Sequence, residues 1–246
     1  MIRVRIDIMS SIVFWLRTIL SKVKRKASSD CKVSFSQCGE DIIVDYIFTV
    51  LRKNKITYLD LGAHSPTYLS NTHFFYLKGS RGVCVEADPS LIAPFQQQRP
   101  DDICLNVGVG MEEGEGDFYI MSSPTLNTFS KEEAERYQSY GRNRIEKTVR
   151  IPLRTVNHIM SEQFDEAPDF ISLDVEGMDF DILKSFDFSI YRPTVFCIET
   201  LIYVEDKTER KITEIIEFMQ QQGYFVYADN YINSIFVDVK VWENRL

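Results

Sequence analysis

The chain has 246 residues, of which 44% are hydrophobic and 13% aromatic, and its net charge is −8. This composition is typical of a globular protein rather than a disordered one, and the length favours a single large domain. Residues 1–30 carry seven Lys or Arg and two Asp, which leaves 21 basic and 34 acidic residues in the rest of the chain. A body this acidic would repel a phosphate backbone, which argues against nucleic acid as a partner.

Residues 1–35 are predicted to be a helix and a small polar linker. Apolar residues recur at helical spacing within residues 8–26, and a basic cluster lies at the end of that stretch. Arg17 interrupts the apolar run, which is too short to span a bilayer. The pattern fits a helix lying on the inner face of a membrane, and equally a helix that packs on its own domain or on a second copy. The oligomeric state stays open.

The five cysteines show no Cys-x-x-Cys pairing. Cys84, Cys104 and Cys197 each lie in an apolar run, where a thiol behaves as a small hydrophobic group. No secretory cleavage site follows the apolar stretch near the N-terminus. We therefore expect a reduced protein in the cytoplasm, either free or held at the inner face of the membrane.

Strands and helices alternate through residues 36–246. Predicted strands are 56–61, 82–86, 102–107, 169–174, 194–199, 224–228 and 234–239, and predicted helices are 40–53, 71–78, 89–98, 131–139, 178–185 and 208–222. Continuous apolar strands separated by helices indicate an α/β fold with a mostly parallel seven-stranded sheet covered on both faces. The segments 114–121 and 147–153 predict a small extra β insertion around the loop 122–130.

The first predicted strand ends in YLDLGAHSPT, residues 58–67. Ligands of open α/β sheets bind beyond the carboxyl ends of the strands. A dinucleotide fingerprint would need glycines at 62, 64 and 67, but only Gly62 is present, beside His64 and Thr67. The second strand ends in Glu86, which is placed to accept both hydroxyls of a ribose. This pair of features favours a nucleoside without a diphosphate, and S-adenosylmethionine has that shape.

Several motifs occur in order along the chain. They are SQCGED (36–41), YLDLGAH (58–64), SNTHFFYLKGSRGVCVEADP (70–89), LNTF (126–129), ISLDVEGMD (171–179) and YRPTVFCIET (191–200). Together they resemble the FkbM-type methyltransferases. The resemblance implies a Rossmann-like methyltransferase domain over residues 36–246, S-adenosylmethionine as methyl donor, and O-methylation of a sugar, glycan or other small-molecule hydroxyl. Ser80 departs from the aromatic residue that relatives often carry there, which leaves the acceptor less defined than the donor.

The resemblance also implies residues that bind the cofactor. By its motifs the backbone at Gly62 approaches the methionine part, Asp60 orders the loop, and Glu86 binds the ribose. Asn106, at the end of the third strand, is expected either to contact adenine or to form a turn. The remaining two cofactor residues are Gln37 and Glu40, in a segment that either starts a helix or also folds over the cofactor.

Catalysis is expected at the end of the fourth strand. Asp174 and Glu176 lie where an acceptor hydroxyl would meet the methyl group, and a carboxylate there can take its proton. Asp174 ranks first because it is nearer the strand end. His64 is a candidate for positioning the acceptor, or equally a structural hydrogen-bond donor. Glu199 could join the two acids, and the three carboxylates could instead hold Mg²⁺, the less favoured alternative.

Three other functions are weighed against this one. An NAD(P)-dependent oxidoreductase would use a Tyr-x-x-x-Lys pair, and Tyr203 and Lys207 have that spacing, but outside the expected helix and without a glycine-rich loop. A nucleic-acid methyltransferase that methylates the amino group of a base typically has Asn-Pro-Pro-aromatic after the fourth strand, where this chain has DVEG. A non-catalytic binding protein of the same fold would not need acids at three strand ends.

Overall fold

The computed structural model describes residues 31–202 and 210–245. The chain divides into two units, residues 1–33 and residues 34–246, and all the helices and strands described below belong to the second. The helix predicted within residues 8–26 lies outside the described residues. Within the described ranges, no helix is long and apolar enough to cross a membrane.

The central sheet has seven strands in the order β11-β12-β8-β7-β1-β2-β3. Their bounds are β1 Thr57–Leu61, β2 Arg81–Val85, β3 Ile103–Leu105, β7 Phe170–Leu173, β8 Val195–Glu199, β11 Tyr224–Asp229 and β12 Asn233–Asp238. All neighbours pair in parallel except β12, which is antiparallel to both β8 and β11. The predicted α/β class and mostly parallel seven-stranded sheet are confirmed. Strands β11 and β12 form an antiparallel hairpin that closes the sheet.

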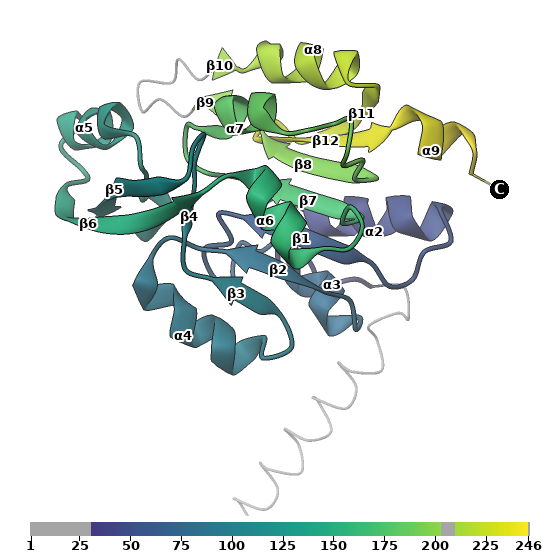
Figure 1. Ribbon diagram of the computed structural model, residues 1–246, viewed down its shortest axis with the longest axis horizontal. Coiled ribbons are helices and arrows are strands. Elements are labelled where there is room, and N and C mark those ends of the chain that lie inside the picture. Colours follow the sequence, from purple (N-terminus) through teal and green to yellow (C-terminus); the bar gives the residue numbers. More distant parts are fainter. Residues whose placement is uncertain (1–30, 203–209, 246) are drawn as a thin grey trace, which may run out of the picture. The chain divides into compact units, whose positions relative to one another are not determined.

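Helices cover both faces of this sheet. Their bounds are α2 Glu40–Val50, α3 His73–Leu77, α4 Pro89–Gln98, α5 Lys131–Ser139, α6 Val156–Gln163, α7 Asp179–Ser185, α8 Thr213–Gln221 and α9 Val239–Glu243. In Figure 1, α6 and α7 lie in front of the sheet and α2 and α3 lie behind it.

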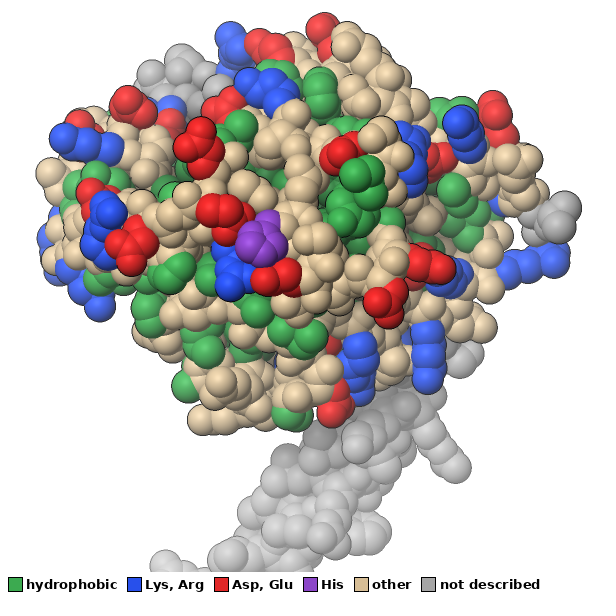
Figure 2. Space-filling view, viewed as in Figure 1, with side chains coloured by type: hydrophobic (Ala, Val, Ile, Leu, Met, Phe, Trp, Pro, Cys, Tyr) green, Lys and Arg blue, Asp and Glu red, His purple; other side chains and the backbone are tan. Residues whose placement is uncertain are grey.

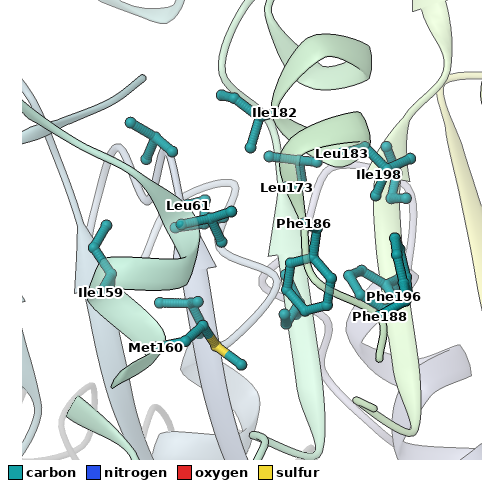
Figure 3. Close-up of a cluster of buried hydrophobic side chains, with 14 of the residues drawn as sticks. Leu61, Ile159, Met160, Leu173, Ile182, Leu183, Phe186, Phe188, Phe196 and Ile198 are labelled. Carbon is teal, nitrogen blue, oxygen red and sulfur yellow. The ribbon is translucent and has the colours of Figure 1, made fainter. Parts of the chain in front are cut away.

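Alternating side chains of the strands form two cores. Leu61 and Leu173 point to the face covered by α6, α7 and α8, where they pack with Met160 and with a group of phenylalanines that includes Phe196 (Figure 3). Tyr58, one of the intervening residues, points to the opposite face and packs with side chains of α2 and α3. Burial on both faces explains why the strands read as continuous apolar runs in the sequence.

A second, three-stranded sheet is inserted between β3 and β7. It consists of β4 Gly108–Val109, β5 Gly114–Met121 and β6 Ile145–Arg154 in the order β4-β6-β5. The short helical turn η1 Pro124–Leu126 and α5 lie between β5 and β6. The predicted β insertion is therefore present, and it sits at the end of the central sheet toward which the arrows of β7 and β8 point (Figure 1).

The structure differs from the predicted helices in three places. The helix predicted from residue 208 begins at Thr213, because Arg210–Lys211 form strand β10, which pairs with β9 Leu201–Ile202. Helix α6 was not predicted, although Thr155 caps it by accepting from the amide of His158. Helix α9 was also missed, since its five residues give too little periodicity to read.

On the face drawn in Figure 2, basic and acidic side chains alternate instead of gathering by sign. The described residues include surface ion pairs, such as that of Arg154 with Glu162. Exposed pairs of this kind add little stability.

Candidate active site

A cavity of about 440 Å³ lies beyond the carboxyl ends of β1, β2, β7 and β8 and extends to the insertion. Six of the sequence-predicted site residues line it: Gln37, Gly62, His64, Glu86, Asp174 and Glu176. Three others, Glu40, Asp60 and Asn106, do not line it and contribute through contacts described below. The cavity is large enough for a drug-sized ligand.

Gly62 fits tightly against the strand beside it. Its φ of 79° is in the left-handed region, and a Cβ atom added there would lie 1.8 Å from the carbonyl oxygen of Asp174. The amide of Asp174 in turn donates to the carbonyl of Leu61 at 3.0 Å. A residue with a side chain could not adopt this arrangement, so the glycine allows the ends of β1 and β7 to meet at the cavity.

Glu86 joins the turns that follow β1 and β2. Its Oε2 accepts from the amide of His64 at 2.7 Å, and its Oε1 accepts from the amide of Asp88 at 2.6 Å. Burial raises its pKa to about 7, against the lowering effect of these two hydrogen bonds. Because a carboxylate has roughly four acceptor positions, one remains on each oxygen for a hydroxyl in the cavity.

Asp60 acts beneath the loop rather than in the cavity. It is buried and accepts from the hydroxyl of Thr72 at 2.6 Å. The guanidinium of Arg99, also fully buried, donates to Thr72 Oγ1 at 3.0 Å, to Ser70 Oγ at 3.3 Å and to the carbonyl of Pro66 at 3.4 Å. These contacts hold the loop between β1 and α3, a role the sequence indicated for Asp60 but not for Arg99.

Glu40 ties the N-terminal segment to the β11–β12 hairpin. Its Oε1 accepts from the side-chain amides of Asn230 and Asn233, both at 2.7 Å, and its Oε2 accepts from the amide of Cys38 at 2.8 Å. Both carboxylate oxygens are thus used within the fold, next to Gln37, which is exposed and lines the cavity. Only Gln37 of this predicted pair is in place to touch a ligand.

Asn106 supports the backbone next to Glu86. Its side-chain amide donates to the carbonyl of Glu86 at 2.9 Å and to that of Ala87 at 3.1 Å. These contacts reach the end of β2 rather than forming a local turn at residue 106, and they fix the direction in which Glu86 leaves the strand.

Carboxylates dominate the other half of the cavity. Those that line it are Glu133, Asp174, Glu176, Asp179 and Glu199. Burial is the largest cause that raises their pKa values, and the charges of neighbouring carboxylates raise several of them further, Asp174 to about 7. Asp179 accepts from the amides of Val175 and Gly177, and so shapes the turn after β7.

The described part of the chain contains no group of three His, Cys, Asp or Glu side chains placed to hold a metal ion. The carboxylates therefore share one cavity without converging on one point. Tyr203 and Lys207, the pair that an oxidoreductase would use, lie outside the described residues.

His64 has a φ of 49°, a strained conformation for a residue with a side chain. Burial lowers its pKa, so the imidazole is neutral near pH 7. Its backbone amide, not its ring, makes the contact with Glu86. The residue lines the cavity, where a neutral imidazole can accept or donate one hydrogen bond.

The insertion adds residues that the sequence did not identify as part of the site. Phe118, Phe129 and Tyr137 line the cavity, and the hydroxyl of Thr128 donates to the carbonyl of Glu176 at 2.9 Å. Thr128 and Phe129 belong to the motif LNTF. The contact of Thr128 with Glu176 joins residues 48 positions apart, so the sequence alone did not predict it.

Solved structures of similar fold were found. One is a putative RNA methyltransferase from Pyrococcus horikoshii (14% identity, 86% of this chain and 92% of that chain, TM-score 0.41). Another is a 1,6-didemethyltoxoflavin-N1-methyltransferase from Burkholderia thailandensis with bound S-adenosylhomocysteine (12% identity, 93% and 87%, TM-score 0.41). A third is an O-methyltransferase from Bacillus cereus with SAH (10% identity, 90% and 88%, TM-score 0.42).

No curated protein matches the chain. The family comparison is more informative, because its match covers more than half of the sequence and includes the turn at Gly62, Glu86 and the acids that follow β7. The model of the methyltransferase FkbM domain matches residues 60–226, and the chain belongs to this family.

Proposed function

We propose that the protein transfers a methyl group from S-adenosylmethionine to a hydroxyl group of a sugar, a glycan or another small molecule. The observation that carries the proposal is that one cavity joins two chemically different halves. One half has the Gly62 turn and the buried Glu86, and the other has the carboxylates that include Asp174 and Glu176. A donor and an acceptor can therefore be held side by side.

The Glu86 half suits the nucleoside of the donor. The free acceptor positions on Glu86 would bind the ribose hydroxyls, while Asn106 and the amides of His64 and Asp88 keep the carboxylate in place. Gly62 would leave room for the methionine part beside the end of β1, and Gln37 would lie at the edge of the cavity. When bound, the donor supplies a methyl group on a positively charged sulfur, which the acidic cavity favours.

The other half suits a hydroxyl acceptor. Positioning contributes much of the rate of a methyl transfer, and a carboxylate that takes the hydroxyl proton contributes more. Burial raises the pKa of Asp174 to about 7 and that of Glu176 well above its ordinary value, which makes both better proton acceptors than ordinary surface acids. The aromatic side chains of the insertion can cover the apolar face of a sugar ring.

The test is a transfer assay with S-adenosylmethionine labelled in its methyl group. The acceptor panel should contain monosaccharides, lipid-linked glycans and hydroxylated metabolites, with matched amine, thiol and carboxyl compounds. We expect label in hydroxyl compounds only, and much less of it with Glu86→Gln protein when the donor is kept below its saturating concentration. Label confined to amines would contradict O-methylation, and donor binding without transfer to any class would favour the non-catalytic alternative.

A further inference from the structure

The turn after β7 is held in a strained shape. Glu176 has a φ of 53° and Gly177 a φ of 96°, both in the left-handed region. A residue with a side chain adopts this conformation only when its surroundings stabilise it, since it costs about 1–3 kcal/mol. A Cβ atom at Gly177 would lie 3.1 Å from Cγ of Glu133 in α5, so the turn is also packed against the insertion.

Two contacts from the insertion fix Glu176. Thr128 holds its backbone through the carbonyl, and the hydroxyl of Tyr137 donates to its Oε2 at 3.4 Å. Tyr137 is buried in α5, with 4% of its surface exposed. Burial, and then the charges of Glu176 and Glu133, raise the pKa of Tyr137, so the phenol keeps its proton and remains a donor.

Asp174 is held by backbone groups. Its amide donates to the carbonyl of Leu61, and the backbone amide of Glu176 bonds to its carboxylate, which opposes the rise of its pKa. A proton acceptor in catalysis usually has a third group that orients it. Among the described residues, Glu176 has a side chain in this role, Tyr137, whereas Asp174 has only a backbone amide.

We propose that Tyr137 is a positioning residue that aims the Glu176 carboxylate into the cavity, and that Glu176 rather than Asp174 receives the acceptor proton. This inference rests on the proposed function. The acceptor oxygen forms the new bond to the methyl carbon, the carbon–sulfur bond breaks with its electrons left on sulfur, and the hydroxyl proton moves to Glu176.

Several charged groups face Glu176, and they bear on its titration. They are Glu133 and Arg136 from α5, Asp174 from its own turn, Asp179 from the start of α7, and Glu199 from β8. Burial and the neighbouring acids raise the pKa of Glu176, and the Tyr137 hydroxyl lowers it. Loss of the hydroxyl must therefore move the titration of Glu176 to higher pH.

The first experiment needs no acceptor. Protein with ¹³C-labelled glutamate carboxyls is titrated by NMR, and the Glu176 signal is identified by its loss in Glu176→Gln. In Tyr137→Phe we expect its midpoint to rise by about half a pH unit, because a hydrogen bond of 3.4 Å is longer than the usual O–H···O distance and lies at the weak end of the range for such bonds. Tyr140→Phe, which removes a hydroxyl at the end of the same helix, should leave the midpoint unchanged.

An unchanged midpoint in Tyr137→Phe, or an equal rise in Tyr140→Phe, would overturn the positioning role. If Tyr137→Phe does not fold, Glu176→Asp withdraws the carboxylate from Tyr137 by one carbon and should change the titration of position 176, which is then followed with ¹³C-labelled aspartate carboxyls. Binding of S-adenosylhomocysteine to the unaltered protein is measured separately. Its failure would count against the proposed function, whereas an unchanged Glu176 midpoint would count only against this inference.

The second experiment uses the acceptor found in the transfer assay. In Tyr137→Phe the acid limb of the pH–rate profile should move up by about half a unit, with turnover about threefold lower at pH 7 and recovering at high pH. The KM for S-adenosylmethionine should not change. Turnover should fall by about 10²–10⁴ in Glu176→Gln, more than in Asp174→Asn. The reverse order, or a loss in Tyr137→Phe that is equal at every pH, would contradict the assignment.

Discussion

Glu86→Gln tests how the donor is held. In the structure both oxygens of Glu86 accept backbone amides, from His64 at 2.7 Å and from Asp88 at 2.6 Å. A glutamine keeps the shape but presents an NH₂ group to one of these donors, which leaves a buried amide without a partner. We expect the free energy of unfolding at acidic pH to fall by about 1–3 kcal/mol, while the domain remains folded.

Ligand affinity should respond more strongly and with a distinct pH dependence. Burial raises the pKa of Glu86 to about 7, and the ionised form is the better acceptor for ribose hydroxyls. In the unaltered protein, affinity for S-adenosylhomocysteine should therefore rise as the pH increases through 7. In Glu86→Gln the affinity at pH 8 should be about ten- to a hundredfold lower and should lack that rise.

The raised pKa of Glu86 also affects the stability of the fold, which should fall with increasing pH where ligand affinity rises. The folded pKa of about 7 lies above the ordinary value of 4.5, so Glu86 contributes stability that is present below pH 4.5 and is lost between 4.5 and 7. The full loss is on the order of 3 kcal/mol. Relative to the glutamine variant, the unaltered protein should lose stability over that range, measured by urea unfolding. Equal affinity in both proteins at every pH would refute the role of Glu86 in binding.

Four further predictions follow from the site. Gly62→Ala should lower the free energy of unfolding in urea by about 3 kcal/mol or more, because its Cβ would meet the backbone of Asp174. Gly141 has a similar φ of 76° and open space around it, so Gly141→Ala should lower the free energy of unfolding by only about 1 kcal/mol. Asp174→Asn removes a charge that raises the pKa of Glu176, so the acid limb of the pH–rate profile should move to lower pH, and a move upward would contradict this. Turnover should be the same with a chelator and with added Mg²⁺, and loss on chelation would support the metal alternative. Deletion of residues 1–30 should leave binding of S-adenosylhomocysteine intact and abolish salt-sensitive binding to anionic vesicles, whereas a split oligomer would favour the packing interpretation.

The strand-end motifs made the donor half of the site readable from the sequence. Gly62 and Glu86 end buried strands, and parallel strands bring their carboxyl ends to one edge of the sheet, so apolar runs and turn residues were enough to place them together. Asp174 and Glu176 were placed in the same way. The alternation of apolar strands and helices predicted the α/β class, and the family motifs predicted the Rossmann-like methyltransferase fold.

Contacts between distant segments were not readable. Arg99 donates to the hydroxyl of Tyr58, 41 positions away, and Tyr137 contacts Glu176 across 39 positions. Neither residue has a local signal, because an arginine after a helix or a tyrosine within one usually faces solvent. Asn106 and Glu40 show the converse, since their positions suggested a ligand but their amide and carboxyl groups are used within the fold.

The most direct test of the central claim is calorimetric titration of the whole protein with S-adenosylhomocysteine and, separately, with NAD. The cavity has a single glycine at its first turn and an acid at the end of the second strand, so it should bind S-adenosylhomocysteine at one site per chain and give no signal with NAD. A clear signal with NAD and none with S-adenosylhomocysteine would contradict the account.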